Sequence, residues 1–239
     1  TILMTNDAGV SWSLQYHTPQ IERPLLDVHF FDAHHGITIG AYGTFLRTQD
    51  GGVSWVSEMH SEFLSQDDLD YLEEIRLEDE AFYIEELASI LPHLNSVSQS
   101  GERLYLAGEA GLLAISDDMG LTWQRMDINY YGSFFDFAKT DSGRIFAVGL
   151  RGHLFELDHD EQQWNAINSG STSSLNAIIS IDEKNSIILG NNGAQVYISG
   201  SQVTYAQSED GKAILKGTFK DGQVVAVTEV GIKYIHKDL

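Results

Sequence analysis

The stretch that decides the fold runs from Gly40 to Trp55 and reads GAYGTFLRTQDGGVSW. It joins Gly-x-x-Gly, a short apolar run and Thr-x-Asp-x-Gly-x-x-Trp. Gly-x-x-Gly returns with its second glycine at 111, 152 and 193, and a weaker copy, Thr-Glu-Val-Gly, ends at 231, so the later steps are 41, 41 and 38 residues. The first step, from 43 to 111, is longer than 41 by 27 residues. This fixed period of about 41 residues predicts a repeat architecture.

Each repeat carries the same succession of short strands. In the repeat around the quoted stretch, apolar runs at Leu25–Phe31, Ile37–Ile39 and Thr44–Thr48 are separated by turn residues, and a fourth strand begins at Trp55. An aromatic residue stands twelve positions after the second glycine in four repeats, at Trp55, Trp123, Trp164 and Tyr205. We therefore predict an all-β fold, a β-propeller of four-stranded blades.

The strand count predicts an incomplete ring. The first repeat holds only a third and a fourth strand, and the last ends with a third strand at Ile232–His236, so about five and a half blades are visible in one β-propeller domain over 1–239. A seven-bladed ring would need about 287 residues, and we expect the N-terminal blades to be missing from this sequence. Six blades with gaps, or five blades closed by joining the chain ends, are the alternatives.

Three copies of a motif, called the Asp-box from here on, match [Ser/Thr]-x-Asp-x-Gly-x-x-Trp. They consist of Thr5, Asp7, Gly9, Trp12; Thr48, Asp50, Gly52, Trp55; and Ser116, Asp118, Gly120, Trp123. The aspartate and hydroxyl can bond to the hairpin backbone, the glycine can supply a positive φ, and the tryptophan can pack between blades. Each copy offers one carboxylate at the Asp position of the motif and no oxygen cage for calcium, so we interpret the boxes as structural.

The succession of Leu-x-Asp-Val-x-Phe-Phe at Leu25–Phe31, Gly-x-x-Gly and Thr-x-Asp-Gly-Gly-x-Ser-Trp resembles the photosystem II stability/assembly factor family of Asp-box propellers. The resemblance is sharpest over Leu25–Val56 and implies seven blades and a non-enzymatic assembly scaffold on the lumenal or periplasmic side. Photosynthetic members present an arginine-rich surface, whereas the seven arginines here are scattered and the net charge is −21. The sequence is therefore similar to the non-photosynthetic branch, and the identity of the client does not carry over.

The 27 additional residues form an insertion at about 61–92. Ser61–Pro92 contains eleven acidic residues and one basic residue, Arg76. Apolar residues recur at helical spacing, which predicts one or two amphipathic helices. Ser65 and Asp67 are candidate N-caps, and Pro92 ends the second helix.

Strand alternation places the insertion on a definite face. The connection between blades and the Gly-x-x-Gly turn both lie opposite the Asp-box hairpins, because successive strands reverse direction. We expect partner contacts on this insertion-bearing face, from the candidate residues Tyr42, Leu72, Ile75, Tyr83, Leu87, Glu109 and Arg151. The alternative is that the apolar stripe only packs on the propeller while the acidic residues are solvated.

Composition excludes several classes of function. A net charge of −21 argues against binding nucleic acid, and the absence of cysteine excludes disulfides and cysteine nucleophiles. No apolar run is long enough to span a bilayer, so direct membrane insertion is not expected. The chain opens without an apolar leader, so we expect any signal peptide to be absent or removed.

The main alternative function is glycan binding or a sialidase-like glycoside hydrolase activity, because sialidases also carry Asp-boxes. Such a site needs arginines that converge on a substrate carboxylate, and this sequence lacks the accompanying Arg-Ile-Pro type of motif. The His34-His35 pair lies in a turn, where solvation is more common than metal binding. We predict no catalytic, cofactor or metal residues. The expected function is that of a periplasmic or otherwise exported scaffold for a protein client, with membrane complexes among the candidate clients.

Overall fold

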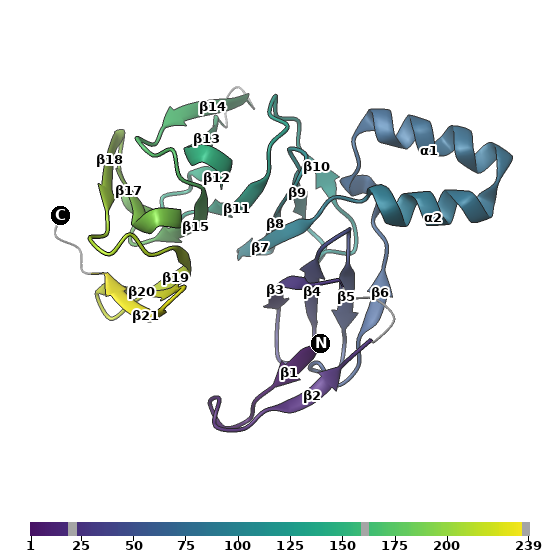
Figure 1. Ribbon diagram of the computed structural model, residues 1–239, viewed down its shortest axis with the longest axis horizontal. Helices are drawn as coiled ribbons and strands as arrows, with labels where there is room; N and C mark the ends of the chain where they lie inside the picture. Colours follow the sequence, from purple (N-terminus) through teal and green to yellow (C-terminus); the bar gives the residue numbers. More distant parts are fainter. Residues whose placement is uncertain (19–22, 159–162, 236–239) are drawn as a thin grey trace.

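The computed structural model describes residues 1–18, 23–158 and 163–235. Its strands form antiparallel sheets that follow one another along a curved array, with two helices projecting beside the second four-stranded sheet (Figure 1). The predicted fold class, a β-propeller with a helical insertion, is confirmed.

Four sheets are complete blades in which sequential strands are neighbours. The strands of the first two blades are β3 (Leu25–Phe30), β4 (Gly36–Gly40), β5 (Phe45–Thr48), β6 (Val56–Glu58), β7 (Leu94–Ser100), β8 (Arg103–Gly108), β9 (Leu113–Ser116) and β10 (Gln124–Arg125). The next two blades consist of β11 (Phe134–Lys139), β12 (Ile145–Gly149), β13 (His153–Asp158), β14 (Gln163–Asn168), β15 (Leu175–Ser180), β16 (Asn185–Gly190), β17 (Ala194–Ser199) and β18 (Gln202–Gln207).

Two partial sheets flank these blades. A hairpin of β1 (Ile2–Met4) and β2 (Ser13–Tyr16) precedes them, and β19 (Ile214–Lys220), β20 (Gln223–Thr228) and β21 (Gly231–Ile235) follow them. The strand predicted at Ile232–His236 therefore corresponds to β21, although His236 lies outside the described residues. The Asp-box register identifies β1 and β2 as a third and a fourth strand.

The core lies between blades rather than within one sheet. Separate clusters of buried side chains fill the spaces between successive blades, and the largest lies between the first two blades and the helices. The first strand of each blade also has a register shift after its first paired residue, at Leu25, Leu94, Phe134, Leu175 and Ile214. This recurrent bulge turns one side chain per blade toward the centre of the array.

The insertion contains two helices, α1 (Gln66–Glu78) and α2 (Glu80–Ile90), after a short 3₁₀ turn at Ser61–Phe63. Ser65 is the N-cap of α1, whereas the other candidate, Asp67, lies within the helix. Asp79 ends α1 and caps α2 by accepting from the backbone N–H groups of Ala81 and Phe82. One residue therefore joins the helices in a tight hairpin, and α2 ends two residues before Pro92.

Candidate functional site

The Gly-x-x-Gly turns and the connections between blades lie together on one face. The first residue inside four of these turns donates its backbone N–H to the carbonyl oxygen of the residue just before its own blade; these donors are Ala41, Glu109, Leu150 and Asn191. The second glycine of the first turn, Gly43, donates to Pro92 at the end of the insertion, and Gly111 donates to Gly132. These contacts place the insertion on the face expected from strand alternation.

The backbone at the turn tips follows a repeated pattern. The residue before the second glycine has a positive φ in four turns, at Tyr42, Ala110, Arg151 and Asn192. The first glycine of the motif is required for space rather than for a positive φ. A Cβ on Gly149 would lie 2.1 Å from the Ser133 carbonyl oxygen, and one on Gly40 would lie 2.2 Å from that of Pro24. The motif therefore fixes close contact between a turn and the adjacent connection, and it presents one side chain per blade at the tip.

Three of the predicted partner-binding residues are accessible at these tips. The Tyr42 side chain is 48% exposed, lies near the Arg23 guanidinium and meets the His93 ring edge to face. Glu109 forms an ion pair with His93, with 3.4 Å between Oε1 and Nδ1. Arg151 is exposed on the tip of the third complete blade. The structure brings Tyr42 and Glu109 together around His93 and leaves Arg151 on a separate blade.

The predicted residues of the insertion have a different environment. Leu72 and Leu87 are 2% and 5% exposed and belong to the core between the helices and the first blades. The prediction that they contact a partner is wrong for this conformation, because their side chains hold the hairpin against the propeller. Tyr83 is half-buried against the same core, and Ile75 is also half-buried. The apolar residues that are exposed on the helices are Tyr71, Leu77, Phe82 and Ile84.

Both ends of the insertion are tied to the blades. His60 is buried against the Phe45 and Phe63 rings and lies between the Glu58 and Glu62 carboxylates. Burial alone would raise the pKa of Glu62, but the hydrogen bond with His60, the backbone hydrogen bonds and the charge of His60 together outweigh burial and lower that pKa.

Two arginines complete the attachment. Arg125 of the second blade donates to the carbonyl oxygens of Phe63 and Ala110, and burial lowers the pKa of this guanidinium. Arg23 reaches the carbonyl oxygens of Tyr42 and Ala88. The insertion is therefore a fixed projection beside the tips of the first two blades.

The central channel is a second candidate site. A cavity of about 500 Å³ is lined by side chains from the inner strands of all four complete blades and of β19. Lys216 projects into it, with its Nζ 3.6 Å from Asp136, 3.7 Å from Asp27 and 2.9 Å from the Ser96 hydroxyl. Burial on its own would lower the pKa of Lys216, but the two carboxylates outweigh burial and raise it. The Lys216 ammonium and the Asp27 and Asp136 carboxylates of the channel therefore form ion pairs with one another.

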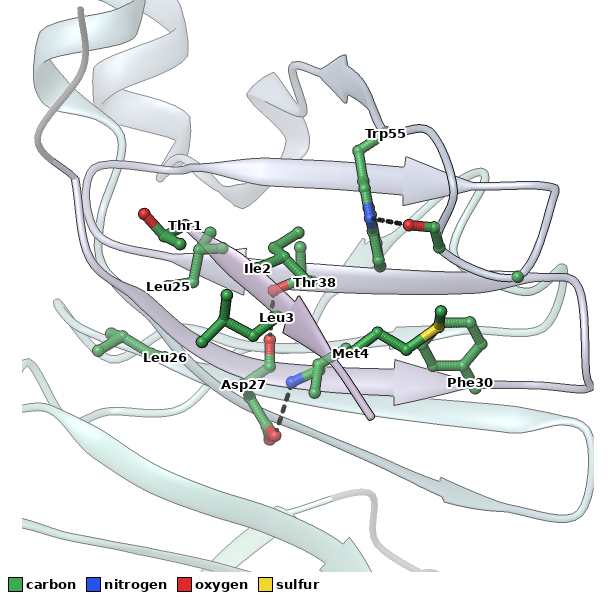
Figure 2. A pocket seen from close by; sticks show the side chains of 13 residues that line it. Thr1, Ile2, Leu3, Met4, Leu25, Leu26, Asp27, Phe30, Thr38 and Trp55 are labelled. Carbon is green, nitrogen blue, oxygen red and sulfur yellow. Dashed lines mark hydrogen bonds between the residues drawn. The ribbon is translucent and has the colours of Figure 1, made fainter. Parts of the chain in front are cut away.

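An apolar cavity of about 370 Å³ lies between β1 and the first complete blade. Figure 2 shows Ile2 and Leu3 of β1 beside Leu25 and Leu26, with Trp55 pointing in from the other side. Two polar side chains of its lining are engaged locally, since the Thr38 hydroxyl donates to the Asp27 carbonyl oxygen and the Trp55 indole donates to the Gly52 carbonyl oxygen. The cavity therefore presents a mainly apolar surface.

Each Asp-box forms the same network of hydrogen bonds. In the second copy, the Thr48 hydroxyl donates to Asp50 and accepts from the Gly52 N–H, and the Trp55 indole donates to Gly52. The sequence reasoning missed one participant, the hydroxyl residue before each tryptophan, which donates to the second aspartate oxygen at 2.6 Å in Ser11, Ser54 and Thr122. The recurrent Ser-Trp or Thr-Trp pair was the available signal.

The tryptophans differ in burial. Trp55 and Trp123 are 9% and 6% exposed between blades, as expected, but Trp12 is 60% exposed. The prediction that Trp12 packs between blades is wrong for the described residues, because no blade covers that side of the hairpin.

The arginines considered for a sialidase-like site are dispersed. Arg47 pairs with Glu58 and donates to two carbonyl oxygens of the next Asp-box, while Arg144 pairs with Glu156. Arg103 pairs with Asp117, and none of the arginines in the described ranges lines the central channel. In those ranges we also find no group of three His, Asp or Glu side chains suited to a metal ion, and no helix long and apolar enough to cross a membrane.

Comparison with known proteins bears on the family. The model of the photosynthesis system II assembly factor YCF48 family matches residues 4–107, somewhat under half of the chain. A comparison with curated protein sequences gave no match. The structure is similar to that of YCF48 bound to a D1 peptide, with 16% identity, a TM-score of 0.65, and coverage of 98% of this chain and 72% of that one. The family resemblance predicted from the sequence is confirmed.

Other solved structures share the fold. The extracellular domain of the hybrid two-component system BT4673 from B. thetaiotaomicron is 13% identical with a TM-score of 0.64, over 96% of this chain and 28% of that chain. BamB from Moraxella catarrhalis is 14% identical with a TM-score of 0.55, over 93% of this chain and 61% of that chain. At these identities the likeness concerns the fold alone.

Proposed function

We propose that this chain, which resembles the YCF48 family in sequence and in fold, is a non-enzymatic scaffold that docks a protein client through its insertion-bearing face. The client is a protein, with subunits of membrane complexes as the first candidates, and the scaffold works in the periplasm or another exported compartment. The similar YCF48 structure carries a D1 peptide. That binding is a property of YCF48, and it supports the class of partner proposed here rather than its identity.

The observation that carries the proposal is the fixed helical hairpin beside the tips of two blades. Ala88, Leu91 and Pro92 contact the Arg23, Gly43 and Tyr42 region, while Tyr42 itself remains 48% exposed. A helical hairpin that is fixed next to exposed tip side chains offers a preorganised surface, which lowers the entropic cost of binding. No comparable observation favours the glycan alternative. Six of the seven arginines, all except Arg151, pair separately with carboxylates or carbonyl oxygens instead of converging.

The test is affinity capture from detergent-solubilised membranes of the source cells with surface variants. Deleting the insertion would strip cover from buried Phe45, Leu94 and Trp123, so loss of binding could reflect unfolding. Tyr42→Asn and Arg151→Asn are better probes, because asparagine tolerates the positive φ of both positions. We expect the double variant to lose at least about 90% of a client that the unchanged protein retains.

Leu121→Ser is the matched control, since Leu121 is 58% exposed on an Asp-box hairpin at the opposite face. Equal capture by the double variant and the control would contradict the proposed face. Capture of no protein by the unchanged chain would contradict the scaffold function. Fractionation of the source cells tests the exported location, which a purely cytoplasmic pool would contradict.

A further inference from the structure

The helical hairpin exposes apolar side chains beyond those that attach it to the propeller. The attachment uses Leu72, Leu87 and Leu91, all buried. Outside this packed side, Leu77 is 80% exposed, Ile84 52%, Phe82 49% and Tyr71 46%. All four lie within fourteen consecutive residues of α1 and α2. The Tyr71 hydroxyl donates to Glu86, which is one turn after Phe82 on α2, so Tyr71 and Phe82 lie on the same side of the hairpin, whereas Ile84 points to a different side. Large apolar side chains exposed together on a projecting element are typical of a protein-binding surface.

These apolar residues lie in a field of negative charge. The described helices and their joining residue contain Asp67, Asp68, Asp70, Glu73, Glu74, Glu78, Asp79, Glu80, Glu85 and Glu86. Arg76 is the one basic residue of the hairpin, and it is occupied by Glu73, Glu80 and the Tyr83 ring. The hairpin therefore has a large excess of carboxylates that no cation of its own can neutralise.

Charge and apolar exposure together select the occupant. A partner with an apolar face could bury that face against the exposed side chains of the hairpin. Lysines or arginines beside the partner's apolar face would then lie next to the hairpin carboxylates. Nucleic acid and anionic lipid would be repelled by the same carboxylates. The joint between the two helices is also hydrogen-bonded on both sides, since the Asp79 carboxylate accepts from the first backbone N–H groups of α2 and the Asp79 N–H donates to the Ile75 carbonyl oxygen.

We propose that the exposed side of this hairpin binds a basic amphipathic helix of the client. The proposal rests on the proposed scaffold function and specifies the chemistry of the segment that the scaffold recognises. The client helix places its apolar stripe on Leu77, Phe82 and Tyr71 and its basic residues on the carboxylates around them. Recognition then depends on both contributions, the apolar contact and the charge.

The test uses the full chain and a fluorescently labelled model peptide of about 18 residues, built from leucine and lysine at helical spacing. The control peptides have the same composition in scrambled order, or glutamate in place of lysine. Binding is followed by fluorescence anisotropy at several salt concentrations. We expect the Leu/Lys helix to bind at least about tenfold more tightly than either control peptide, with affinity falling as salt rises.

Protein variants separate the two contributions. Leu77→Ser with Phe82→Ser is expected to weaken binding about tenfold, whereas the matched control Leu121→Ser leaves it unchanged. Glu74→Gln with Glu78→Gln is expected to weaken binding and flatten its salt dependence. Circular dichroism and melting curves establish that all variants are folded.

Several outcomes would overturn the inference. One is equal binding of the ordered and scrambled peptides, which would indicate charge attraction alone. Another is unchanged affinity of the Leu77/Phe82 variant. Stronger binding to neutral phosphatidylcholine vesicles than to the peptide would indicate a membrane surface instead. The proposed scaffold function is tested separately, because a client lost with the Tyr42/Arg151 variant but kept by the Leu77/Phe82 variant would retain the scaffold and reject the basic helix.

Discussion

At the scale of single residues, the repeated motifs work through short-range contacts whose energies can be ranked. The Asp-box aspartate holds a hairpin by accepting from a neighbouring hydroxyl and several groups of its own turn. The Gly-x-x-Gly motif instead clears space for a carbonyl oxygen. The Asp-box depends on the carboxylate oxygens of its aspartate, whereas the Gly-x-x-Gly motif depends on the absence of a Cβ atom at its first glycine. Substitutions should reveal this difference.

Asp118→Ala should lower the free energy of unfolding by about 1–3 kcal/mol, because it removes the acceptor for Ser116, for the Thr122 side chain and for the Thr122 N–H. Urea denaturation measures the change. Asp7→Ala, in the hairpin whose Trp12 is exposed, should have a smaller effect. An equal effect of the two substitutions would show that packing of the box between blades adds nothing.

Gly149→Ala should destabilise the protein by about 1–3 kcal/mol, because the new methyl group would lie 2.1 Å from the Ser133 carbonyl oxygen. The φ of Gly149 is extended, so the cost is one of space alone. Gly143→Ala is the companion variant, since its Cβ would meet open space but its φ is +84°. Its expected cost of about 1 kcal/mol is conformational. A larger loss for Gly143→Ala in thermal melts would reverse this assignment.

The pH dependence of stability should be concentrated at acid pH. Hydrogen bonds from Ser11 and Thr5 lower the pKa of Asp7 to about 2, and similar bonds lower the pKa values of Asp50 and Asp118 below the usual 3.8. A carboxylate whose pKa is lower in the folded state than in the unfolded state stabilises the protein at pH values above its unfolded-state pKa. This stabilisation is lost as the pH falls through the folded-state pKa. Melting temperatures should therefore fall between about pH 4 and pH 2 because of these groups. Asp50→Asn should reduce that fall, and an unchanged profile would contradict the argument.

At the scale of elements, the helical hairpin is bound to the propeller by one side and exposed on the other. Leu72→Ala and Leu87→Ala should each cost about 2–5 kcal/mol, because both side chains are buried in the largest core cluster. Leu77→Ala should change stability by less than about 0.5 kcal/mol, since that side chain is 80% exposed. Chemical denaturation compares the free energies of unfolding of the three variants. An unchanged free energy of unfolding in Leu72→Ala would mean that the hairpin contributes little to the core.

At the scale of the whole molecule, Lys216 links inner strands that are far apart in sequence. Its ammonium lies close to Asp27 of β3 and Asp136 of β11, and Asp136 is 3% exposed. Lys216→Met should destabilise the protein by about 1 kcal/mol, less than for a fully buried pair because the lysine side chain is 48% exposed.

Hydrogen exchange localises this effect. Amides of β19–β21 should exchange faster in Lys216→Met than in the parent protein, because the link from that sheet to the first and third blades is lost. Lys212→Met is the matched control, since Lys212 lies just before β19 and pairs with Glu229 in the turn between β20 and β21, so this pair makes no link to another blade. Faster exchange spread evenly over all blades would indicate a general loss of stability instead.

The sequence by itself determined the repeat, the strand order within each blade and the helical character of the insertion, although it left open whether the insertion has one helix or two. These features are local: glycine turns, alternating strands and helical spacing act within a few residues, so their signals lie next to one another in the chain. The same holds for the Asp-box hydrogen bonds, which link residues no more than four positions apart.

Only the tertiary structure decided which side chains of those elements are free. Leu72 and Leu77 belong to one amphipathic helix, yet one is buried and the other exposed, because exposure depends on which side meets the blades. Trp12 and Trp55 have the same motif and differ because a neighbouring blade covers only the second. The channel ion pairs of Lys216 join residues that are 80 positions apart for Asp136 and 189 positions apart for Asp27, and no periodicity in the sequence pairs Lys216 with Asp27. Burial and long-range pairing arise from how the blades assemble, which is why the candidate surface required the structure.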